Sequence, residues 1–405
     1  MFHRLSITNF GAIRDLQVLD FSISNKVEHE EDRQIVGYQN SRVPKIAAIL
    51  GANASGKTTA IRALGFLADF TSRSALYPPD AGLIFYPFSD KESQEAKSKL
   101  SVEFEADWFS PGNPMPLRYT MVAAPGKSSF QRVVESEALE YKPASQWTAL
   151  VVREQDRASF RREMGSLGGK IPRTALARNN ASVISLLGQF VAGNALVDTI
   201  QNSLSGVVSN FYFWGRPRRT DEETAKMYAD DPGTLKALNN LIKRADLGIN
   251  DVRVQEFPGI GSGESKRMIL YFRHSGLNSD LPAALESQGT MNFVSVFPLI
   301  HRVLVSGGLA LMDELDSDLH PELLREILGW FTDPETNPHN AQLITTCNNP
   351  AVLDFLRKEE IFFSKKDDGG RVKLYGLKDI PGVRRDANFQ RDYLAGRYGA
   401  IPYIG

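Results

Sequence analysis

The sequence is short of the features that would place it outside the cell or in a membrane. Cys347 is the single cysteine among 405 residues, which excludes an internal disulfide framework and a cysteine-based zinc cluster. No stretch approaches the roughly 20 consecutive apolar residues of a membrane span, and the N-terminus lacks the apolar core of a signal peptide. We therefore expect a cytoplasmic protein without a membrane role.

An excess of charge of one sign is also lacking. The 47 lysines and arginines nearly balance 48 aspartates and glutamates, so the formal net charge is -1. This balance argues against a protein coated in positive charge for indiscriminate nucleic-acid binding, although local patches can still contact phosphates. The length and the 42% hydrophobic content suit a globular chain of two or three lobes.

A phosphate-binding loop is the clearest feature that is present. The segment LGANASGKTT matches G-x-x-x-x-G-K-[ST] between an apolar strand pattern over residues 45–50 and a helical apolar pattern over residues 58–70. In such a loop backbone N–H groups surround phosphates, the lysine adds a cation and the hydroxyl can ligate Mg²⁺. The sequence thus predicts binding of ATP and Mg²⁺. The expected binding residues are Gly51, Asn53, Ser55, Gly56, Lys57, Thr58 and Thr59.

The segment GGLALMDELDSDLHP supplies the acidic half of such a site. Residues 309–312 predict a buried strand, and Asp313 and Glu314 stand at its C-terminal end. Asp313 is expected to hold Mg²⁺ through water, and Glu314 to polarise the attacking water as a catalytic residue, together with Lys57. Asp316 and Asp318 form a D-x-D pattern that would also suit a metal-dependent nuclease, which is a less favoured interpretation.

Together these motifs resemble the ABC-type, SMC-like ATPase heads, in particular the small bacterial AAA-family ATPases of abortive-infection systems. Those families carry the Asp-Glu pair, a D-loop like residues 315–318, and an E-S-x-G-T signature like ESQGT at residues 286–290. The resemblance implies an α/β fold: a P-loop ABC-type ATPase head with flanking antiparallel strands and an inserted helical lobe. We expect an N-terminal ATPase lobe over 1–150, the helical insertion over 151–245 and a C-terminal ATPase lobe over 246–405.

The signature carries a prediction about assembly. Ser287 and Gly289 precede a helical apolar pattern, so a hydroxyl and backbone amides would face an anion. In the resembling families this motif binds the ATP of a second copy, which implies an ATP-sandwich homodimer or a higher oligomer. A plain serine-capped helix is the alternative.

The segment AQLITTCNNPAVLD resembles the switch of these families, in which a histidine contacts the γ-phosphate. Here the position falls on Cys347 or Asn348, and we favour Asn348 as the catalytic counterpart. An asparagine amide can donate a hydrogen bond but cannot take a proton as imidazole does, so slow turnover is expected. Cys347 is expected to be a small buried thiol.

Two expectations concern the insertion. Residues 214–234 are polar and predict a mobile surface loop. Eight basic residues of the insertion could contact DNA, RNA or an acidic partner, but their acidic neighbours favour a solvated face of mixed charge. These basic residues are Arg153, Arg157, Arg161, Arg162, Lys170, Arg216, Arg218 and Arg219.

The resemblance implies an oligomeric ATPase that acts as sensor or scaffold in anti-phage defence, as in Septu, PARIS and retron-associated systems. Such ATPases work with a separately encoded nuclease or toxin effector, and a nucleic acid or a phage protein would be a further partner. The alternative is a RecF-like DNA-repair ATPase that clamps DNA, which would bind DNA with a steep salt dependence.

Overall fold

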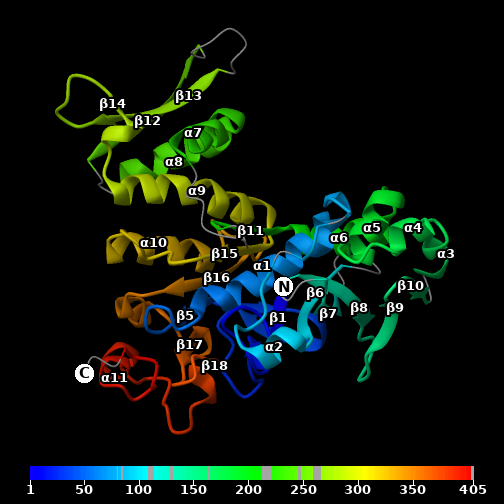
Figure 1. The fold of residues 1–405 in the computed structure, drawn as a ribbon. Coiled ribbons are helices and arrows are strands. Elements are labelled where there is room, and N and C mark those ends of the chain that lie inside the picture. The colour runs from blue at the N-terminus through cyan, green and yellow to red at the C-terminus, as the bar shows by residue number, and fades with distance from the viewer. Residues whose placement is uncertain are drawn as a thin grey trace.

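The computed structural model describes residues 1–402 except 80, 84, 108–113, 128–130, 162–163, 212–219, 245–247 and 259–265. Two large sheets enclose a helix between them, and a further small sheet forms the top of the molecule (Figure 1). The predicted α/β class is confirmed.

The first large sheet has seven antiparallel strands in the order β10-β9-β8-β7-β6-β1-β2. Its residues alternate between buried and half-buried along β7 and β8, which is the pattern of a sheet with one face on the core. The antiparallel strands predicted to flank the ATPase head are confirmed. The strands are β1 (Phe2–Thr8), β2 (Gln17–Asp20), β6 (Ser98–Ala106), β7 (Met115–Pro125), β8 (Arg132–Tyr141), β9 (Thr148–Glu154) and β10 (Arg157–Phe160).

The second large sheet has six strands in the order β11-β15-β16-β5-β17-β18, all parallel except the last. Its central strands are buried on both faces and read as continuous apolar runs. Because the strands are parallel, the loops that follow them meet at one edge. The strands are β5 (Ile46–Leu50), β11 (Val207–Ser209), β15 (Leu309–Met312), β16 (Gln342–Cys347), β17 (Ile361–Lys366) and β18 (Val372–Gly376).

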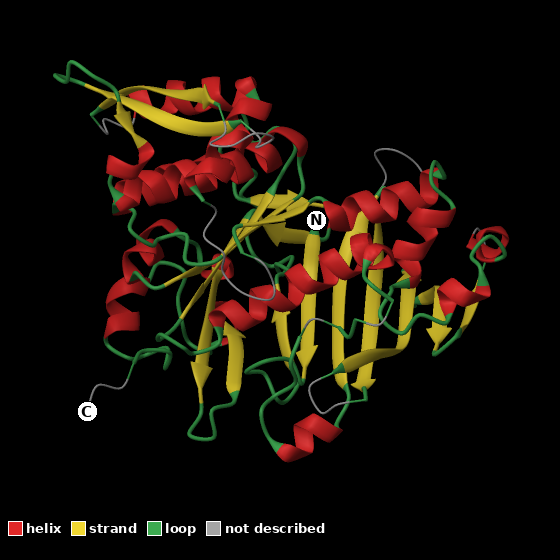
Figure 2. Ribbon diagram, turned by 45° about the horizontal axis from the view of Figure 1, so that its top comes forward, coloured by secondary structure: helices red, strands yellow, loops and turns green. Residues whose placement is uncertain are grey.

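Helices cover both faces of the parallel sheet. α1 (Lys57–Arg73) contacts β16 on one side and the antiparallel strands β6 and β1 on the other, so it fills the space between the two large sheets. Helices cross one face of the antiparallel sheet (Figure 2). α9 (Gln288–Ser306) and α10 (Pro321–Thr332) belong to a second core on the opposite face of the parallel sheet.

The insertion is mostly helical, as predicted, but it also contributes strands to both large sheets. β9 crosses the predicted boundary at residue 150, and β11 is an edge strand of the parallel sheet. The division at residues 150 and 245 stays a prediction. The helices are α3 (Gly165–Gly168), α4 (Arg173–Leu176), α5 (Val183–Phe190), α6 (Ala195–Ser205), α7 (Asp221–Asp230) and α8 (Pro232–Arg244).

The prediction of a mobile loop over residues 214–234 is wrong where the structure describes it. α7 and α8 occupy most of this segment, and α7 begins with a capping box in which Thr220 and Glu223 satisfy each other's backbone N–H groups. The acidic run that suggested a loop is the first turn of a helix, where negative charge is favourable. Residues 214–219 of the predicted loop lie outside the described part of the chain.

A small sheet packs on α7 and α8 and forms the top of Figure 1. Its strands are β12 (Ile249–Phe257), β13 (Arg267–His274) and β14 (Leu281–Pro282). The remaining elements are β3 (Gln34–Val36), β4 (Arg42–Pro44), α2 (Lys91–Glu95) and α11 (Phe389–Leu394). None of the helices in the described ranges combines the length and apolarity that a bilayer crossing needs.

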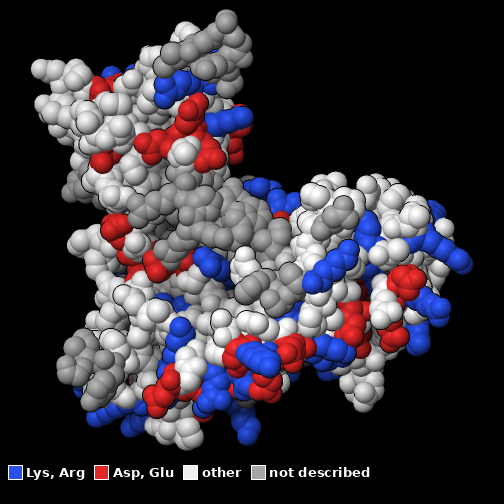
Figure 3. Space-filling view, in the orientation of Figure 1, with Lys and Arg blue, Asp and Glu red and all other residues white. Residues whose placement is uncertain are grey.

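The expectation of a solvated mixed-charge face is wrong for Arg153. This side chain is fully buried and donates to Glu137 at 2.9 Å, directly across the β8–β9 ladder. Other basic residues of the set, such as Arg157 and Lys170, are exposed. Lysine, arginine and acidic residues are interspersed on the face shown in Figure 3. The predicted basic residues Arg162, Arg216, Arg218 and Arg219 lie outside the described residues.

Candidate nucleotide-binding site

The phosphate-binding loop lies between β5 and α1, as the sequence predicted. Glycine is required at both of its ends. A Cβ atom on Gly51 would come within 2.1 Å of the Ser364 carbonyl oxygen, and one on Gly56, whose φ is +104°, within 2.3 Å of Val372. The loop therefore packs tightly against the β17–β18 hairpin, which fixes the direction of its backbone N–H groups.

Lys57 begins α1 and is almost buried, with 5% of its surface exposed. Its ammonium group donates to the carbonyl oxygens of Gly51 at 2.8 Å and Ala52 at 3.0 Å, so the side chain curls back over the loop. Burial lowers the pKa of Lys57, and the nearby carboxylates of Glu314, Asp316 and Asp313 oppose that shift. An anionic ligand in the loop would add favourable charge at this cation.

Ser55, in the same loop, has a buried hydroxyl oxygen without a hydrogen-bond partner. Buried polar groups are rarely left unpaired, and such a donor inside a glycine loop suits a phosphate oxygen. The residues of the loop therefore fit a nucleotide phosphate.

The acidic half of the site comes from β15. Asp313 follows this strand and is 4% exposed, and its carboxylate accepts the Thr58 hydroxyl at 2.9 and 3.1 Å. Thr346, on the neighbouring parallel strand β16, donates to the same carboxylate at 2.7 Å. A hydroxyl and a carboxylate in contact form an oxygen donor set that fits Mg²⁺, with Thr58 and Asp313 as the residues that would hold it.

Glu314 and Asn348 also lie at this edge of the sheet. Both line a cavity of about 410 Å³ together with the phosphate loop. Glu314 adopts a left-handed backbone (φ +48°), and its N–H donates to the Thr346 hydroxyl at 2.7 Å. This conformation is not that of a strand, and β15 has ended two residues earlier, at Met312. The residues lining the cavity are Ala12, Asn53, Ala54, Ser55, Gly56, Lys57, Thr58, Thr59, Glu314, Asn348 and Lys366.

Asp316 has a different task from the one a nuclease would give it. One of its carboxylate oxygens accepts the backbone N–H groups of Asn348 at 2.7 Å and Asn349 at 2.5 Å, which ties the D-loop to the segment after β16. Burial raises the pKa of Asp316. In the described residues no three histidine, cysteine or carboxylate side chains are grouped as a metal site. This arrangement favours a structural link over a D-x-D metal centre.

The signature residues do not join the cavity of their own chain. Ser287 is exposed and caps α9, accepting the Thr290 N–H at 3.2 Å. Gly289 packs against the D-loop so closely that a Cβ would lie 2.4 Å from the Asp318 carbonyl oxygen. The structure thus places Ser287 and Gly289 beside the D-loop, on a surface outside the phosphate site.

Two residues that contact Asp313 were missed by sequence reasoning. Thr346 donates to its carboxylate, and Asn210, which follows β11, hydrogen-bonds both its backbone N–H and its carbonyl oxygen. The one available signal is that short β-branched runs, Val207–Val208 and Ile344–Thr346, lie just before Asn210 or include Thr346. Cys347 is fully buried, and burial raises the pKa of its thiol well above the usual value, as expected of an inert core thiol.

A family profile described as "AAA domain, putative AbiEii toxin, Type IV TA system" matches residues 46–113 and 193–354, more than half of the chain. These ranges contain the phosphate loop, the signature, Asp313 and Glu314. No curated protein matches.

Solved structures with a similar course of the chain are SMC heads. The SMC head domain from Thermotoga maritima is 14% identical with a TM-score of 0.43, and 93% of this chain and 98% of that chain are covered. The SmcHead bound to the C-winged helix domain of ScpA is 11% identical with a TM-score of 0.47, covering 92% and 96%. The Pyrococcus furiosus Smc head with an extended coiled coil, bound to the C-terminal domain of ScpA, is 11% identical with a TM-score of 0.45, covering 93% and 96%.

Proposed function

The chain belongs to the AAA-domain family described as putative AbiEii toxin of a Type IV toxin–antitoxin system, and from this premise we propose that it is an ATP-binding and ATP-hydrolysing oligomer. The observation that carries the proposal is the contact of Thr58 with Asp313 next to Lys57, with Glu314 lining the same cavity as Lys57 and Thr58. A phosphate cradle, an oxygen pair for Mg²⁺ and a carboxylate for water are the parts that ATP hydrolysis needs.

Each of the main residues of the candidate site has a defined role in this proposal. Lys57 pairs with the terminal phosphates, and the backbone amides of the loop bind the phosphate oxygens. Thr58 and Asp313 would hold Mg²⁺, which neutralises phosphate charge when bound. Glu314 orients the attacking water and accepts its proton. Asn348 can only donate a hydrogen bond to the γ-phosphate, so we expect slow turnover.

The position of the signature supports a dimer. Ser287 is exposed, and Ser287 and Gly289 lie away from the chain's own phosphate loop, beside the D-loop. We therefore propose that they close over ATP held by a second copy, so that two nucleotides are sandwiched between two protomers. ATP would then act as a latch whose hydrolysis reopens the interface.

We propose a role in bacterial anti-phage defence, in the cytoplasm, with a separately encoded nuclease or toxin as effector. The support is the abortive-infection theme in the family's description and the resemblance of the motifs to the ATPases of Septu, PARIS and retron-associated systems. In this role the ATPase is the sensor or scaffold, and its nucleotide-dependent assembly controls the effector.

The test measures steady-state ATP turnover and oligomeric state of the purified chain beside Glu314→Gln. We expect turnover to fall roughly 100-fold or more, because a general base is worth about that factor. ATP binding should persist, and the variant should accumulate as an ATP-bound dimer in size-exclusion chromatography with light scattering. An unchanged turnover would remove Glu314 from the mechanism, and a wild type that binds no ATP would overturn the proposal.

A glycine pair in the Glu314→Gln background tests the interface. Gly289→Ala places a methyl group against the Asp318 carbonyl oxygen, whereas Gly329→Ala, in α10, meets no atom within 4 Å. We expect Gly289→Ala to bind ATP but remain monomeric, and Gly329→Ala to dimerise. If both variants dimerise equally with ATP, the signature does not form the interface.

A further inference from the structure

Asn210 stands where the edge of the parallel sheet meets the acidic half of the site. β11 pairs in parallel with β15, with Ser209 opposite Leu311, so the residue after β11 comes level with the end of β15. The N–H of Asn210 also reaches the Leu311 carbonyl oxygen at 3.4 Å. The sheet therefore brings this side chain to Asp313 although 103 residues separate the two in the sequence.

The amide of Asn210 makes a reciprocal pair of hydrogen bonds with the backbone of Asp313. Its Oδ1 accepts the Asp313 N–H at 2.7 Å, and its Nδ2 donates to the Asp313 carbonyl oxygen at 3.0 Å. Both backbone groups of the residue are thus fixed by one side chain, in the way that a further strand would fix them. An amide is the side chain that presents one acceptor and one donor side by side.

The two hydrogen bonds of Asn210 hold Asp313 at a point where the backbone changes direction. Glu314, the next residue, has φ +48°, which is unusual for a residue other than glycine, so β15 ends abruptly after Asp313. Surroundings must hold such a conformation in place. The Thr346 hydroxyl holds the Glu314 N–H, and Asn210 holds Asp313, so the two side chains together fix this turn.

Other contacts act on the carboxylate and not on the backbone. Thr58 and Thr346 donate to the Asp313 carboxylate, which sets the rotation of the side chain. Asn210 sets the place from which that side chain starts. A displaced Asp313 backbone would move its carboxylate from the Thr58 hydroxyl, and metal sites depend on such supporting contacts.

We infer that Asn210 is a positioning residue for the Mg²⁺ ligand Asp313. The inference rests on the proposed function, because it assumes that Thr58 and Asp313 hold Mg²⁺ with ATP. It assigns a role in the ATPase to the insertion, since Asn210 comes from β11 and not from the segments that carry the phosphate loop or the Asp-Glu pair.

The test is the Mg²⁺ dependence of ATP binding, measured by titration of a fluorescent ATP analogue in EDTA and at a series of Mg²⁺ concentrations. Asn210→Ala removes both bonds to Asp313. The matched control is Ser209→Ala, which loses only a hydroxyl bond to the Phe211 carbonyl oxygen. Apo unfolding midpoints of both variants, measured in urea, show whether each still folds.

We expect Asn210→Ala to bind the analogue in EDTA as the wild type does, and to need about tenfold more Mg²⁺ for the metal-dependent gain in affinity. Ser209→Ala should keep the wild-type Mg²⁺ dependence. A normal Mg²⁺ dependence in a folded Asn210→Ala overturns the inference and leaves the proposed function standing. Equal weakening with and without Mg²⁺ also overturns it, because the residue would then shape the whole site. If the wild type gains no affinity from Mg²⁺, both the inference and the proposed Mg²⁺ site fail.

If Asn210→Ala does not fold, Asn210→Asp replaces it. An aspartate still accepts the Asp313 N–H but faces the carbonyl oxygen with a second acceptor, so one of the two bonds becomes repulsive. The expected shift in Mg²⁺ dependence is again about tenfold. An aspartate variant with wild-type Mg²⁺ dependence overturns the inference.

Discussion

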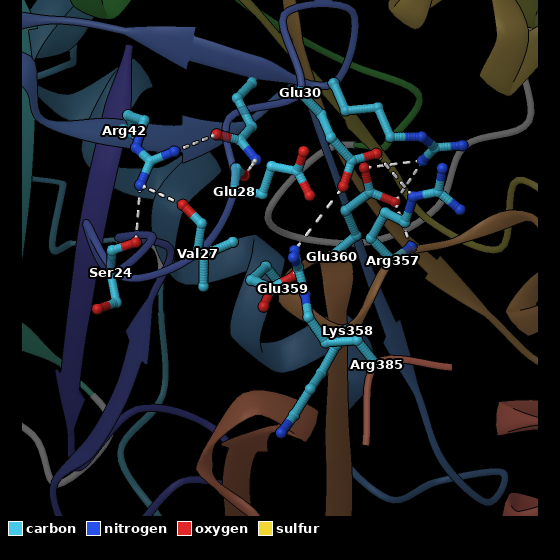
Figure 4. A network of polar contacts seen from close by, with 12 residues as sticks. Ser24, Val27, Glu28, Glu30, Arg42, Arg357, Lys358, Glu359, Glu360 and Arg385 are labelled. Carbon is cyan, nitrogen blue, oxygen red and sulfur yellow. Dashed lines mark hydrogen bonds and ion pairs between the residues drawn. The ribbon is translucent and has the colours of Figure 1, made fainter. Parts of the chain in front are cut away.

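Two polar networks lie at opposite ends of the same parallel strands, and they differ in how completely their atoms are paired. At the C-terminal ends lies the nucleotide cavity, where the Ser55 hydroxyl is buried without a partner. One oxygen of Asp316, whose other oxygen accepts the Asn348 N–H at the same edge, is also unpaired. At the N-terminal ends, just before β17, Glu360 accepts Arg33 at 2.7 and 2.9 Å and the Arg357 N–H at 2.7 Å (Figure 4). The same sheet thus has unpaired buried polar atoms at one end, whereas at the other end both oxygens of the buried Glu360 carboxylate are paired.

The difference separates a binding site from a structural joint. Arg33 also donates to the Phe355 carbonyl oxygen, so the network connects the segment before β3 to the one before β17. Both oxygens of Glu360 are paired within the protein, so this buried carboxylate has no free acceptor for a ligand. Unpaired buried polar atoms are rare in folded proteins, and the Ser55 hydroxyl inside a glycine loop suits a ligand as its partner. Variants at the two ends should therefore fail in different ways.

The largest expected effect is on nucleotide affinity at the cavity. Lys57→Ala removes the buried cation that in the proposed function pairs with the terminal phosphates, and we expect ATP affinity to fall roughly 100-fold or more. Apo stability should change little, because burial of Lys57 already disfavours its charged form. Isothermal titration and urea unfolding measure the two quantities.

The matched control for this variant is Lys373→Ala, an exposed lysine on β18. It should bind ATP as the wild type does. If Lys57→Ala unfolds the protein, the cavity contributes to stability as the network around Glu360 does. The contrast between the two ends of the sheet would then be wrong.

The next effect is on stability at the other end of the strands. Arg33→Met keeps the aliphatic stem but leaves the Glu360 carboxylate, which is 2% exposed, without its main counter-charge. At pH 8 we expect the free energy of unfolding to fall by about 3 kcal/mol, the usual cost of breaking a buried pair. The ATP affinity of the folded variant should be unchanged.

Arg384→Met serves as its control, because the Arg384–Asp386 pair is 80% and 70% exposed and such pairs contribute roughly 0 to 1 kcal/mol. Equal destabilisation by both arginine variants would show that the buried network does not stabilise the sheet. A loss of ATP affinity in folded Arg33→Met would show that the network around Glu360 is coupled to the nucleotide cavity, against our expectation.

The sequence predicted the parts of the cavity that are contiguous in the chain. Strand, glycine loop and helix follow one another at residues 45–70, so their local pattern contains their contacts. The Asp-Glu pair after an apolar run is also local. Asn210 could not be predicted in the same way, because its role depends on β11 pairing beside β15, which is a property of strand order.

The errors have the same origin. Arg153 sits in a run of mixed charge that is typical of a surface, yet its partner Glu137 lies across the ladder on another strand and both are buried. The sequence predicts a loop at the acidic start of α7 because the run of charges is polar. The same run contains a capping box at Thr220, which begins a helix. In each case a contact with a specific partner reverses what composition alone suggests.

The smallest effect is a pH dependence of stability, most of which should come from Glu360 in the structural network. Burial raises the pKa of Glu360 from 4.5 to about 7, although Arg33 opposes the shift. The unfolded chain therefore releases this proton at lower pH than the folded chain, and the free energy of unfolding should decrease from about pH 4.5 to about pH 7. Between pH 5 and 7 we expect a loss of about 2 kcal/mol, and Glu360→Gln should remove that slope.

Asp316 provides the contrast at the nucleotide edge. Burial raises the pKa of Asp316 above its ordinary 3.8, so it acts in the same direction but begins at lower pH. Urea unfolding of wild type, Glu360→Gln and Asp316→Asn across pH 5 to 8 separates the two, because the other titrating groups are common to all three proteins. If Asp316→Asn flattens the slope and Glu360→Gln leaves it, the proton-linked stability lies at the nucleotide edge. The network around Glu360 would then not be the site at which pH changes the stability of the sheet.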